Sequence, residues 1–473
     1  PPHQPHQSYA DLTRRQVAFT VAGMMVTLLL AAMDQTIVGI AMPRVVESLA
    51  GFDRYPWVTT SYLLTSTVAV PIFAKLSDLY GRKWLYLGGV AVFVVSSWLC
   101  GAAGNAPLPL DGMNQLIVFR GLQGIGGGAV MGLTFTIIGD LFAPAERGRF
   151  QGLFGGVFGL ASIVGPVAGG FITERLSWRW AFYVNAPLGI AALAILYFTF
   201  PDVRPTATTR RIDWAGLVTL VGWTVPLLLA LTFVDERGWG DGRVVTLLAA
   251  SAVVLAVFLV VELRVAEPMI PLSLFRDRSI GLASAAVFLV GFGMFGMFVY
   301  LPLYLQGVVG MSAAAAGSIF TPLVLAMVLS SMTCGQIIAR TGRYKPLAVG
   351  GASLATLGML LLTRMSGTPA TAEIVRNLIV CGVGFGAAQP IYALVVQNAA
   401  PAAQLGVATA SVQFFRSIGS TIGVAAFGTL MVGATARAGL DRGMHLVFIG
   451  AALVMGVTLV LNALLPEVPL RRK

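Results

Sequence analysis

Apolar runs of about twenty residues recur along the whole chain, and short polar segments separate them. Each run is long enough to cross a hydrocarbon core of ~30 Å as a helix that rises ~1.5 Å per residue. A transmembrane β-barrel would show alternating segments of ~10 residues instead. The pattern therefore predicts an all-α membrane protein with fourteen transmembrane helices, at residues 17–42, 58–79, 84–104, 114–138, 150–173, 178–200, 213–233, 244–265, 279–306, 312–338, 346–364, 374–397, 405–433 and 444–465.

Composition agrees with a membrane protein. Of the 473 residues, 57% are hydrophobic and 11% are charged, whereas a soluble domain has roughly half apolar and roughly a quarter charged residues. Cys100, Cys334 and Cys381 fall within or beside predicted spans and form no CxxC pair. We therefore expect neither a disulfide framework nor a metal site.

The net charge of +11 is spread over many short loops, which argues against a nucleic-acid surface. With fourteen spans, both chain ends lie on one side of the membrane. That side collects 19 basic residues, and the opposite side collects 10. The positive-inside rule therefore predicts that both termini are cytoplasmic, in a multi-pass protein of the plasma (inner) membrane.

A single carboxylate, Asp34, interrupts the apolar stretch from Val17 to Pro43. A charge at mid-bilayer costs at least ~2.5 to 3.5 kcal/mol by insertion scales, so chains that retain one generally use it for ions, protons or substrate. The alternative is a structural carboxylate that is hydrogen-bonded to a neighbouring helix. No histidine and no other carboxylate lies as clearly within a span.

The fourth span places Arg120, Gln123, Gly124 and Gly127 on one helical face, because their spacing is i, i+3, i+4 and i+7. Asp34 is ~12 Å from the outer end of its span and Arg120 is ~9 Å from the outer start of its own, so the two lie at similar depth. If both helices line one cavity, Arg120 would tune the carboxylate or receive its charge. The alternative is an arginine bonded to backbone carbonyls.

Two further segments suggest conformational roles. The loop after the second span contains Asp78, Gly81, Arg82 and Lys83, a cluster that can form a charge-pair latch, although a basic loop also obeys the positive-inside rule. The fifth span contains small residues at four-residue spacing, which let helix backbones approach closely, and a proline that adds a bend point: Gly165, Pro166, Gly169 and Gly170.

A glycine pattern repeats along the chain at an offset of 258 residues. The offset relates Gly124, Gly126, Gly128, Gly148 and Gly165 to Gly382, Gly384, Gly386, Gly406 and Gly423. We infer two pseudo-symmetric six-helix halves with an inserted helix pair, an architecture typical of secondary transporters. The predicted segments are a cytoplasmic tail (1–16), the N-terminal half (17–200), a cytoplasmic linker (201–212), the inserted hairpin (213–265), the C-terminal half (266–465) and a second cytoplasmic tail (466–473).

The chain contains no GxxxxGK[ST] loop for ATP and no GxSxG or HExxH motif. We therefore expect no enzymatic activity, and an ion gradient or the substrate's own gradient must supply the energy.

Together these segments resemble the major facilitator superfamily and, within it, the fourteen-helix drug/proton antiporter branch of multidrug efflux transporters. The segments that carry the resemblance follow in order: 33–43, 78–83, 120–128, 165–170 and 178–187. We expect the resemblance to extend over essentially the whole chain. One departure is Ala74, where the loop motif usually begins with glycine.

The resemblance implies a major facilitator fold and proton-coupled export by alternating access. It implies that Asp34 binds a proton or a cationic substrate in alternation and that Arg120 tunes it. Asp78 and Arg82 would control the inward gate, and the span 5 motif would prevent leak. It implies no cofactor other than protons as the coupling ion, and a lipophilic small-molecule substrate; we expect a functional monomer.

The sequence identifies the substrate pocket less clearly than it identifies Asp34 and Arg120. Aromatic faces suit lipophilic cations, although aromatic stripes at helical spacing also serve packing. Arg416 is the only charge between Gln404 and Arg437. The candidate contacts are Gln123, Phe292, Phe295, Tyr300, Gln389, Tyr392, Gln413 and Arg416.

Two alternatives stay open. A proton-coupled lipid or lipid-conjugate transporter or flippase would share this fold, because fold alone does not fix the cargo. A nontransporting membrane receptor or scaffold is the alternative from another class.

Overall fold

The computed structural model describes residues 12–49, 51, 54, 56–203, 212–365 and 369–468. These residues contain fourteen helical segments that are long and apolar enough to cross a membrane, as the hydropathy pattern predicts. The outer parts of both predicted tails and linker residues 204–211 lie outside the described residues. The division into six consecutive segments stays a prediction.

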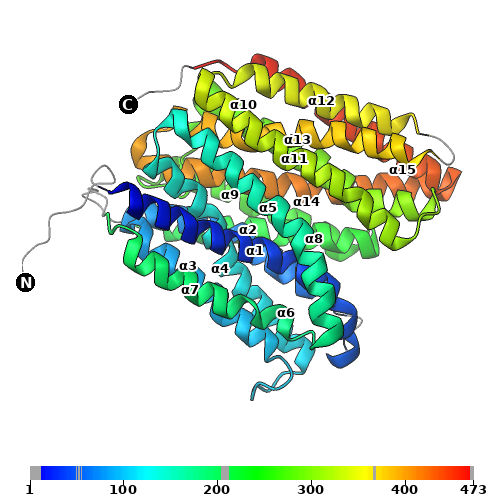
Figure 1. The fold of residues 1–473 in the computed structure, drawn as a ribbon, viewed down its shortest axis with the longest axis horizontal. Helices are drawn as coiled ribbons and strands as arrows, with labels where there is room; N and C mark the ends of the chain where they lie inside the picture. The colour runs from blue at the N-terminus through cyan, green and yellow to red at the C-terminus, as the bar shows by residue number, and fades with distance from the viewer. Residues whose placement is uncertain are drawn as a thin grey trace, which may run out of the picture. The chain divides into compact units, whose positions relative to one another are not determined.

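The chain folds into two compact units (Figure 1). The first unit comprises residues 1–141, 157–213 and 402–410, and the second comprises residues 142–156, 214–401 and 411–473. The start of the fifth helix therefore counts with the second unit, and the start of the fourteenth counts with the first.

The first unit contains α1 (Arg14–Leu49), α2 (Pro56–Tyr80), α3 (Arg82–Gly101), α4 (Gly112–Leu141), most of α5 (Pro144–Arg175), α6 (Trp180–Tyr183) and α7 (Asn185–Thr199). The second contains α8 (Trp214–Arg237), α9 (Gly242–Arg264), η3 (Leu272–Arg276), α10 (Arg278–Gly307), α11 (Ala313–Thr341), α12 (Lys345–Thr363), α13 (Thr371–Ala399), most of α14 (Leu405–Ala438) and α15 (Leu440–Leu464). The short η4 (Ala402–Gln404) precedes α14.

The repeated glycines have the same packing role in both halves. In the first unit, a Cβ at Gly124 or Gly128 would overlap the backbone of α2, and one at Gly126 would overlap the backbone of α3. Helix α4 therefore lies between α2 and α3 at backbone-to-backbone contact, which only glycine allows.

The second unit repeats this arrangement. A Cβ at Gly382 or Gly386 would overlap the backbone of α11, and one at Gly384 would overlap that of α12. Helix α13 is thus placed between α11 and α12 as α4 is between α2 and α3. The offset of 258 residues is a structural repeat, and the two six-helix halves are pseudo-symmetric.

The sixth predicted span is not one continuous helix. It divides into α6 and α7, with Val184 between them. Pro187 has no N–H to donate to the carbonyl of Tyr183, four residues earlier, so one intrahelical hydrogen bond is missing at this junction, while Val184 keeps helical dihedrals of φ −60° and ψ −25°. Helix α7 begins at Asn185, and α6 and α7 together make up one candidate span, Trp180–Thr199.

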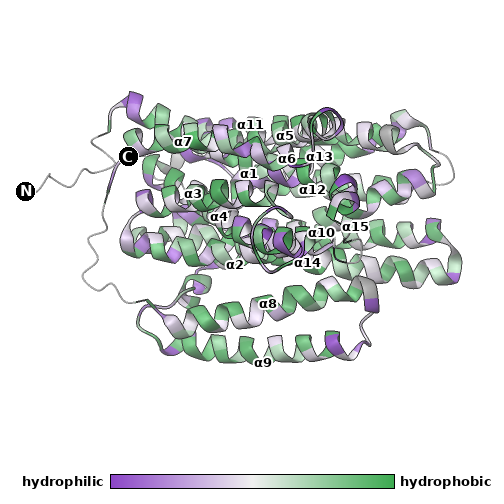
Figure 2. Ribbon diagram, turned by 90° about the horizontal axis from the view of Figure 1, so that it is seen from below, coloured by the Kyte–Doolittle hydropathy of each residue, from purple (hydrophilic) through white to green (hydrophobic). Residues whose placement is uncertain are grey.

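The inserted pair, α8 and α9, pack against each other in the second unit (Figure 2). Trp223 of α8 also stacks edge-to-face on Phe414 of α14, with ring centroids 5.9 Å apart. Helix α9 is the most apolar of the described spans, with a mean hydropathy of 3.0 over its most apolar window, and only 17% of that window is buried. Most of its surface is therefore suited to lipid.

Candidate functional site

Asp34 lies in the middle of α1 and is completely buried. Its Oδ2 accepts a hydrogen bond from Arg120 Nη1 at 2.5 Å, which is also an ion pair. Its Oδ1 accepts from Gln123 Nε2 at 2.9 Å and from Asn185 Nδ2 at 3.0 Å. We call these four residues the Asp34 cluster; they come from α1, α4 and α7.

Arg120 is equally enclosed, with 1% of its surface exposed. Its Nη1 also donates to Gln123 Oε1 at 2.7 Å, and its Nε donates to the carbonyl of Val58 at 3.3 Å. The guanidinium carbon lies 4.3 Å from the ring centroid of Tyr62, within cation–π range. The ion pair, the hydrogen bonds and the aromatic face together compensate the free-energy cost of burying the Arg120 guanidinium.

A second layer orients the cluster from α3. Asn185 Nδ2 also donates to Ser97 Oγ at 3.0 Å, and Ser97 Oγ donates to the carbonyl of Phe182 at 2.9 Å. Cys100 Sγ donates to Gln123 Oε1 at 3.6 Å. Asn185 and Ser97 are not among the sequence-predicted site residues. The available signal for Asn185 was its side-chain amide, two residues before Pro187 in an apolar span.

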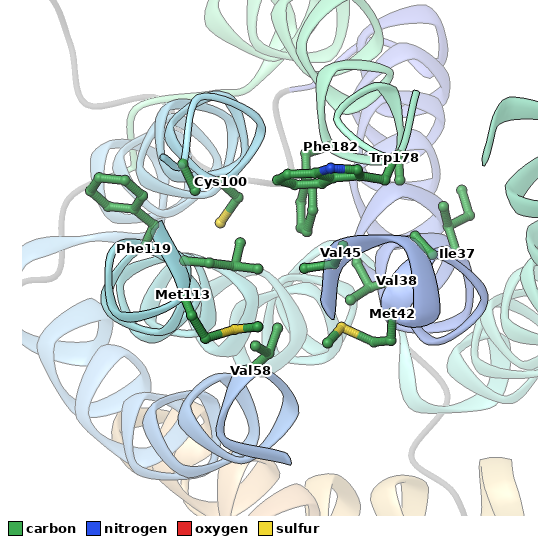
Figure 3. Packing of buried hydrophobic residues seen from close by; sticks show 14 residues of the cluster. Ile37, Val38, Met42, Val45, Val58, Cys100, Met113, Phe119, Trp178 and Phe182 are labelled. Atoms are coloured by element: carbon green, nitrogen blue, oxygen red, sulfur yellow. The ribbon is translucent and has the colours of Figure 1, made fainter. Parts of the chain in front are cut away.

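The Asp34 carboxylate is closed off toward the Leu49 end of α1 by apolar side chains. Ile37, Val38 and Met42 follow it on α1 and pack with Val58 and Phe182, among others, in one buried cluster (Figure 3). This packing excludes water from that side of the carboxylate and strengthens the electrostatic coupling with Arg120.

The chemistry of this arrangement follows from its charge balance. The ionised carboxylate and the guanidinium form a neutral pair, and removing one member of a buried pair costs ~3–5 kcal/mol. A proton on Asp34 would leave Arg120 facing a neutral group. Proton uptake at this site therefore has to be accompanied by a rearrangement or by a new partner for Arg120.

The α2–α3 turn holds a second charged cluster in the first unit. Arg82 Nη1 lies 2.6 Å from Asp78 Oδ1, and Arg82 Nε lies 2.8 Å from Asp140 Oδ2 of α4. Arg82 also donates to the Ser77 hydroxyl. Gly81 joins the two helices with φ 98°, a conformation that side chains disfavour. Asp140 is a partner that the sequence reasoning did not include.

Asp78 also binds the start of α14. Its Oδ1 accepts from the amide of Gly406 at 3.2 Å, and its Oδ2 accepts from the amide of Val407 at 3.0 Å. These are the second and third residues of the helix, whose amides have no intrahelical partner. Lys83 does not join this cluster, because its Nζ lies over the rings of Trp84 and Tyr197 at 5.8 and 5.6 Å.

The glycines of α5 pack on the turn of α1 beside Asp34. A Cβ at Gly165 would overlap the side chain of Thr36, and one at Gly169 would lie 3.2 Å from the Cα of Ile37. Gly170 faces open space. Pro166 lies within α5, and its side chain is outside the described part of the chain.

Most candidate substrate contacts of the second unit have partners within that unit. Phe292 packs edge-to-face on Phe427, and Phe295 does so on Phe298, with centroids 5.2 and 6.2 Å apart. Tyr300 donates to the carbonyl of Val424 at 2.8 Å. The contacts of Phe292 and Tyr300 join α10 to α14, whereas Phe295 and Phe298 lie on the same helix, and the role of these residues in cargo binding stays a prediction.

Tyr392 and Arg416 have polar partners. The Tyr392 hydroxyl accepts from Asn462 Nδ2 at 3.0 Å. Arg416 Nη1 donates to Gln389 Oε1 at 2.8 Å and, within the described residues, has no carboxylate partner. Gln413 is buried. The structure thus joins Gln389 to Arg416, and their role in cargo binding stays a prediction.

Fourteen candidate spans in the described residues, two pseudo-symmetric halves and a buried intramembrane ion pair define a secondary transporter. The family model of the Major Facilitator Superfamily matches residues 24–424, and the chain belongs to this superfamily. It is a multi-pass membrane transporter and not an enzyme.

Among its relatives, the multidrug transporter protein MdtP of Bacillus subtilis (strain 168) is 39% identical, over 87% of this chain and 74% of that protein. Multidrug resistance protein 3 of the same organism is 37% identical, over 87% and 79%. The crystal structure of the human organic anion transporter MFSD10 matches the fold with a TM-score of 0.70 and 16% identity, over 94% of this chain and 99% of that one.

Proposed function

We propose that this transporter exports lipophilic small molecules, including cations, in exchange for protons by alternating access. The observation that carries the proposal is the Asp34–Arg120 ion pair, buried in the middle of a membrane helix. The names of the two Bacillus subtilis relatives support drugs as the cargo.

The proposed cycle uses the charge balance of the Asp34 cluster. When Asp34 is ionised, it pairs with Arg120 and the site is neutral. When a proton binds, the interaction with Arg120 weakens, and the α1 turn whose Thr36 and Ile37 contact the α5 glycines is released from one of its constraints. Proton binding and cargo binding then exclude each other, which produces antiport.

The energy of one proton is sufficient for useful export. A proton that crosses a potential of 100 mV releases ~2.3 kcal/mol, enough for about a fortyfold gradient of a neutral cargo. The proposal includes a plasma (inner) membrane location with both termini cytoplasmic, a functional monomer, and no cofactor other than the coupling protons.

The test is efflux of a fluorescent lipophilic cation from proteoliposomes with and without an imposed pH gradient. We expect Asp34→Asn to abolish the pH-driven component, while Asp241→Asn, a carboxylate in the α8–α9 loop, keeps it. Arg120→Ala should also impair transport. Efflux of the Asp34→Asn variant at the wild-type rate would show that another group carries the proton.

Asp34→Asn alone leaves Arg120 buried without its ion partner, which itself destabilises the fold. The double variant Asp34→Asn/Arg120→Gln removes both charges, and we expect it to fold better than either single variant. It should still lack pH-driven efflux. A double variant that is folded and proton-driven would contradict the proposal.

A further inference from the structure

The second unit contains an apolar groove between α11, α12 and α13, with a volume of about 520 Å³. Its walls include Leu329 and Cys334 of α11, Gly350 and Leu354 of α12, and Ile379 of α13. Leu329 is 63% exposed and Ile379 is 40% exposed, so the groove opens onto the outer face of these helices. Its volume is in the range of ~300–1,000 Å³ that small-molecule sites occupy.

The groove offers hydrocarbon and few free polar groups to a ligand. The Ser330 hydroxyl donates to the carbonyl of Val383 at 2.6 Å, and the Thr333 hydroxyl donates to that of Leu329 at 2.7 Å. Both hydroxyls that line the groove are therefore occupied by backbone. An apolar group such as an alkyl chain is therefore complementary to the groove.

The length of the groove corresponds to one leaflet. Along α12 its wall runs from Pro346, next to the α11–α12 loop, to Leu354, which is ~12 Å along a helix. Half of a ~30 Å hydrocarbon core is ~15 Å. One acyl chain of a lipid, entering from the loop end, matches this depth.

Three cations flank the loop end of the groove: Arg340, Arg343 and Lys345. Arg340 and Arg343 are exposed, and none of the three forms an ion pair within the described residues, although the carboxylates of Glu467 and Asp277 are close enough to act on Tyr344 between them. Arg340 lies seven residues after Thr333 and continues the α11 stripe that lines the groove. Tyr344 fixes the loop, because its hydroxyl donates to the carbonyl of Pro466 at 2.7 Å.

We propose that this groove is a binding site for an anionic phospholipid, with one acyl chain between α11, α12 and α13 and the phosphate against Arg340, Arg343 and Lys345. The observation is an apolar groove of one-leaflet length whose membrane-surface end carries three cations that form no ion pair with any described residue. The site lies wholly within the second unit and does not depend on proton coupling at Asp34.

Gly350 provides a sharp test, because a Cβ added there would meet no atom within 4 Å and would point into open groove. Gly350→Leu should fill the groove without displacing neighbouring helices. Gly317→Leu is the matched control: it also has open space around its Cβ, and it lies at the opposite end of α11.

The first measurement is native mass spectrometry of the full chain with dioleoyl phosphatidylglycerol or dioleoyl phosphatidylcholine. We expect the wild type and Gly317→Leu to retain one more phosphatidylglycerol than phosphatidylcholine, and Gly350→Leu to lose that difference. Arg340→Gln or Lys345→Gln should weaken retention by about fivefold each, which is about 1 kcal/mol per basic residue. Equal retention of both lipids by the wild type would overturn the proposal.

The second measurement is alkylation of Cys334 by N-ethylmaleimide, which remains informative if Gly350→Leu fails to fold. Cys334 lines the groove, whereas Cys100 and Cys381 are fully buried and serve as internal references. Phosphatidylglycerol should slow this alkylation, and glycerol 3-phosphate should not. Protection by glycerol 3-phosphate, or none by phosphatidylglycerol, would show that no acyl chain occupies the groove.

Discussion

Asp34 connects four helices of the first unit through hydrogen bonds. The carboxylate itself lies on α1, its donors Arg120 and Gln123 lie on α4, Asn185 lies on α7, and Ser97 on α3 supports Asn185. Any change in the charge of this carboxylate therefore affects the packing of several helices at once. Protonation of Asp34 would therefore change the packing of these helices as well as the charge of the site.

Asn185→Ala tests this connection. The variant removes one donor from the carboxylate, and a hydrogen bond to a charged group contributes ~1.5–3 kcal/mol. We expect a lower midpoint of thermal unfolding in detergent and slower pH-driven transport. Asn105→Ala, in the exposed α3–α4 loop, should change neither. An unaltered midpoint for Asn185→Ala would mean that Asn185 does not support the cluster.

The sequence placed Asp34 and Arg120 at one depth, and helical periodicity placed Gln123 on the same face as Arg120. Those are local arguments, and the structure joins all three residues. Asn185 and Ser97 could not be predicted from such local patterns, because periodicity within one helix does not indicate which other helices pack beside it. The phenylalanines of α10 were predicted as cargo contacts from their spacing alone; Phe292 packs on Phe427, and a role of either phenylalanine in cargo binding stays a prediction.

At the scale of elements, glycine determines how closely the helices pack. The same three-glycine pattern brings α4 against α2 and α3, and α13 against α11 and α12. Hydropathy alone predicted the spans of the fold, since apolar length is a local property. The break between α6 and α7 was not predicted, although Pro187 was visible, because spans were assigned by length and apolarity.

Gly126→Leu and Gly384→Leu are equivalent substitutions in the two units. Each side chain would collide with the backbone of a neighbouring helix, and overpacking of this kind costs ~1–3 kcal/mol or more. We expect both variants to yield less folded protein by size-exclusion chromatography and to unfold at lower temperature. Gly88→Leu, whose Cβ has open space on α3, is the control and should behave as the wild type. If only one of the two variants is destabilised, the two packing sites are not equivalent.

At the scale of the whole molecule, α14 begins in the first unit and continues in the second. The Asp78 carboxylate binds the start of α14 by accepting hydrogen bonds from the amides of Gly406 and Val407. In the proposed alternating-access cycle the start of α14 would have to move, and these bonds would have to break first.

Asp78→Asn should release the start of α14. Loss of hydrogen bonds to a charged acceptor, ~1.5–3 kcal/mol, shifts a two-state equilibrium by about 10- to 150-fold. Spin labels at Tyr80→Cys and Ala403→Cys, with the three native cysteines replaced by alanine, should report a broader distance distribution by electron–electron double resonance.

Asp277→Asn is the matched control, because Asp277 also accepts from two helix-start amides, those of Ser279 and Ile280, but within its own helix. Its distance distribution should match that of the parent. If Asp78→Asn also leaves the distribution unchanged, Asp78 does not hold the start of α14 in place.

The contrast between α9 and the glycine-packed helices bears on biosynthesis. The most apolar window of α9 has a mean hydropathy of 3.0 and is 17% buried, whereas that of α4 has 1.4 and is 67% buried. Insertion into a bilayer one segment at a time favours apolar helices such as α9. Helix α4 brings Arg120 and Gln123 into hydrocarbon, and their partners lie on other segments. Helices α1 and α2 leave the ribosome before α4. We therefore expect stable insertion of α4 to require that α1 and α2 are still next to the translocon.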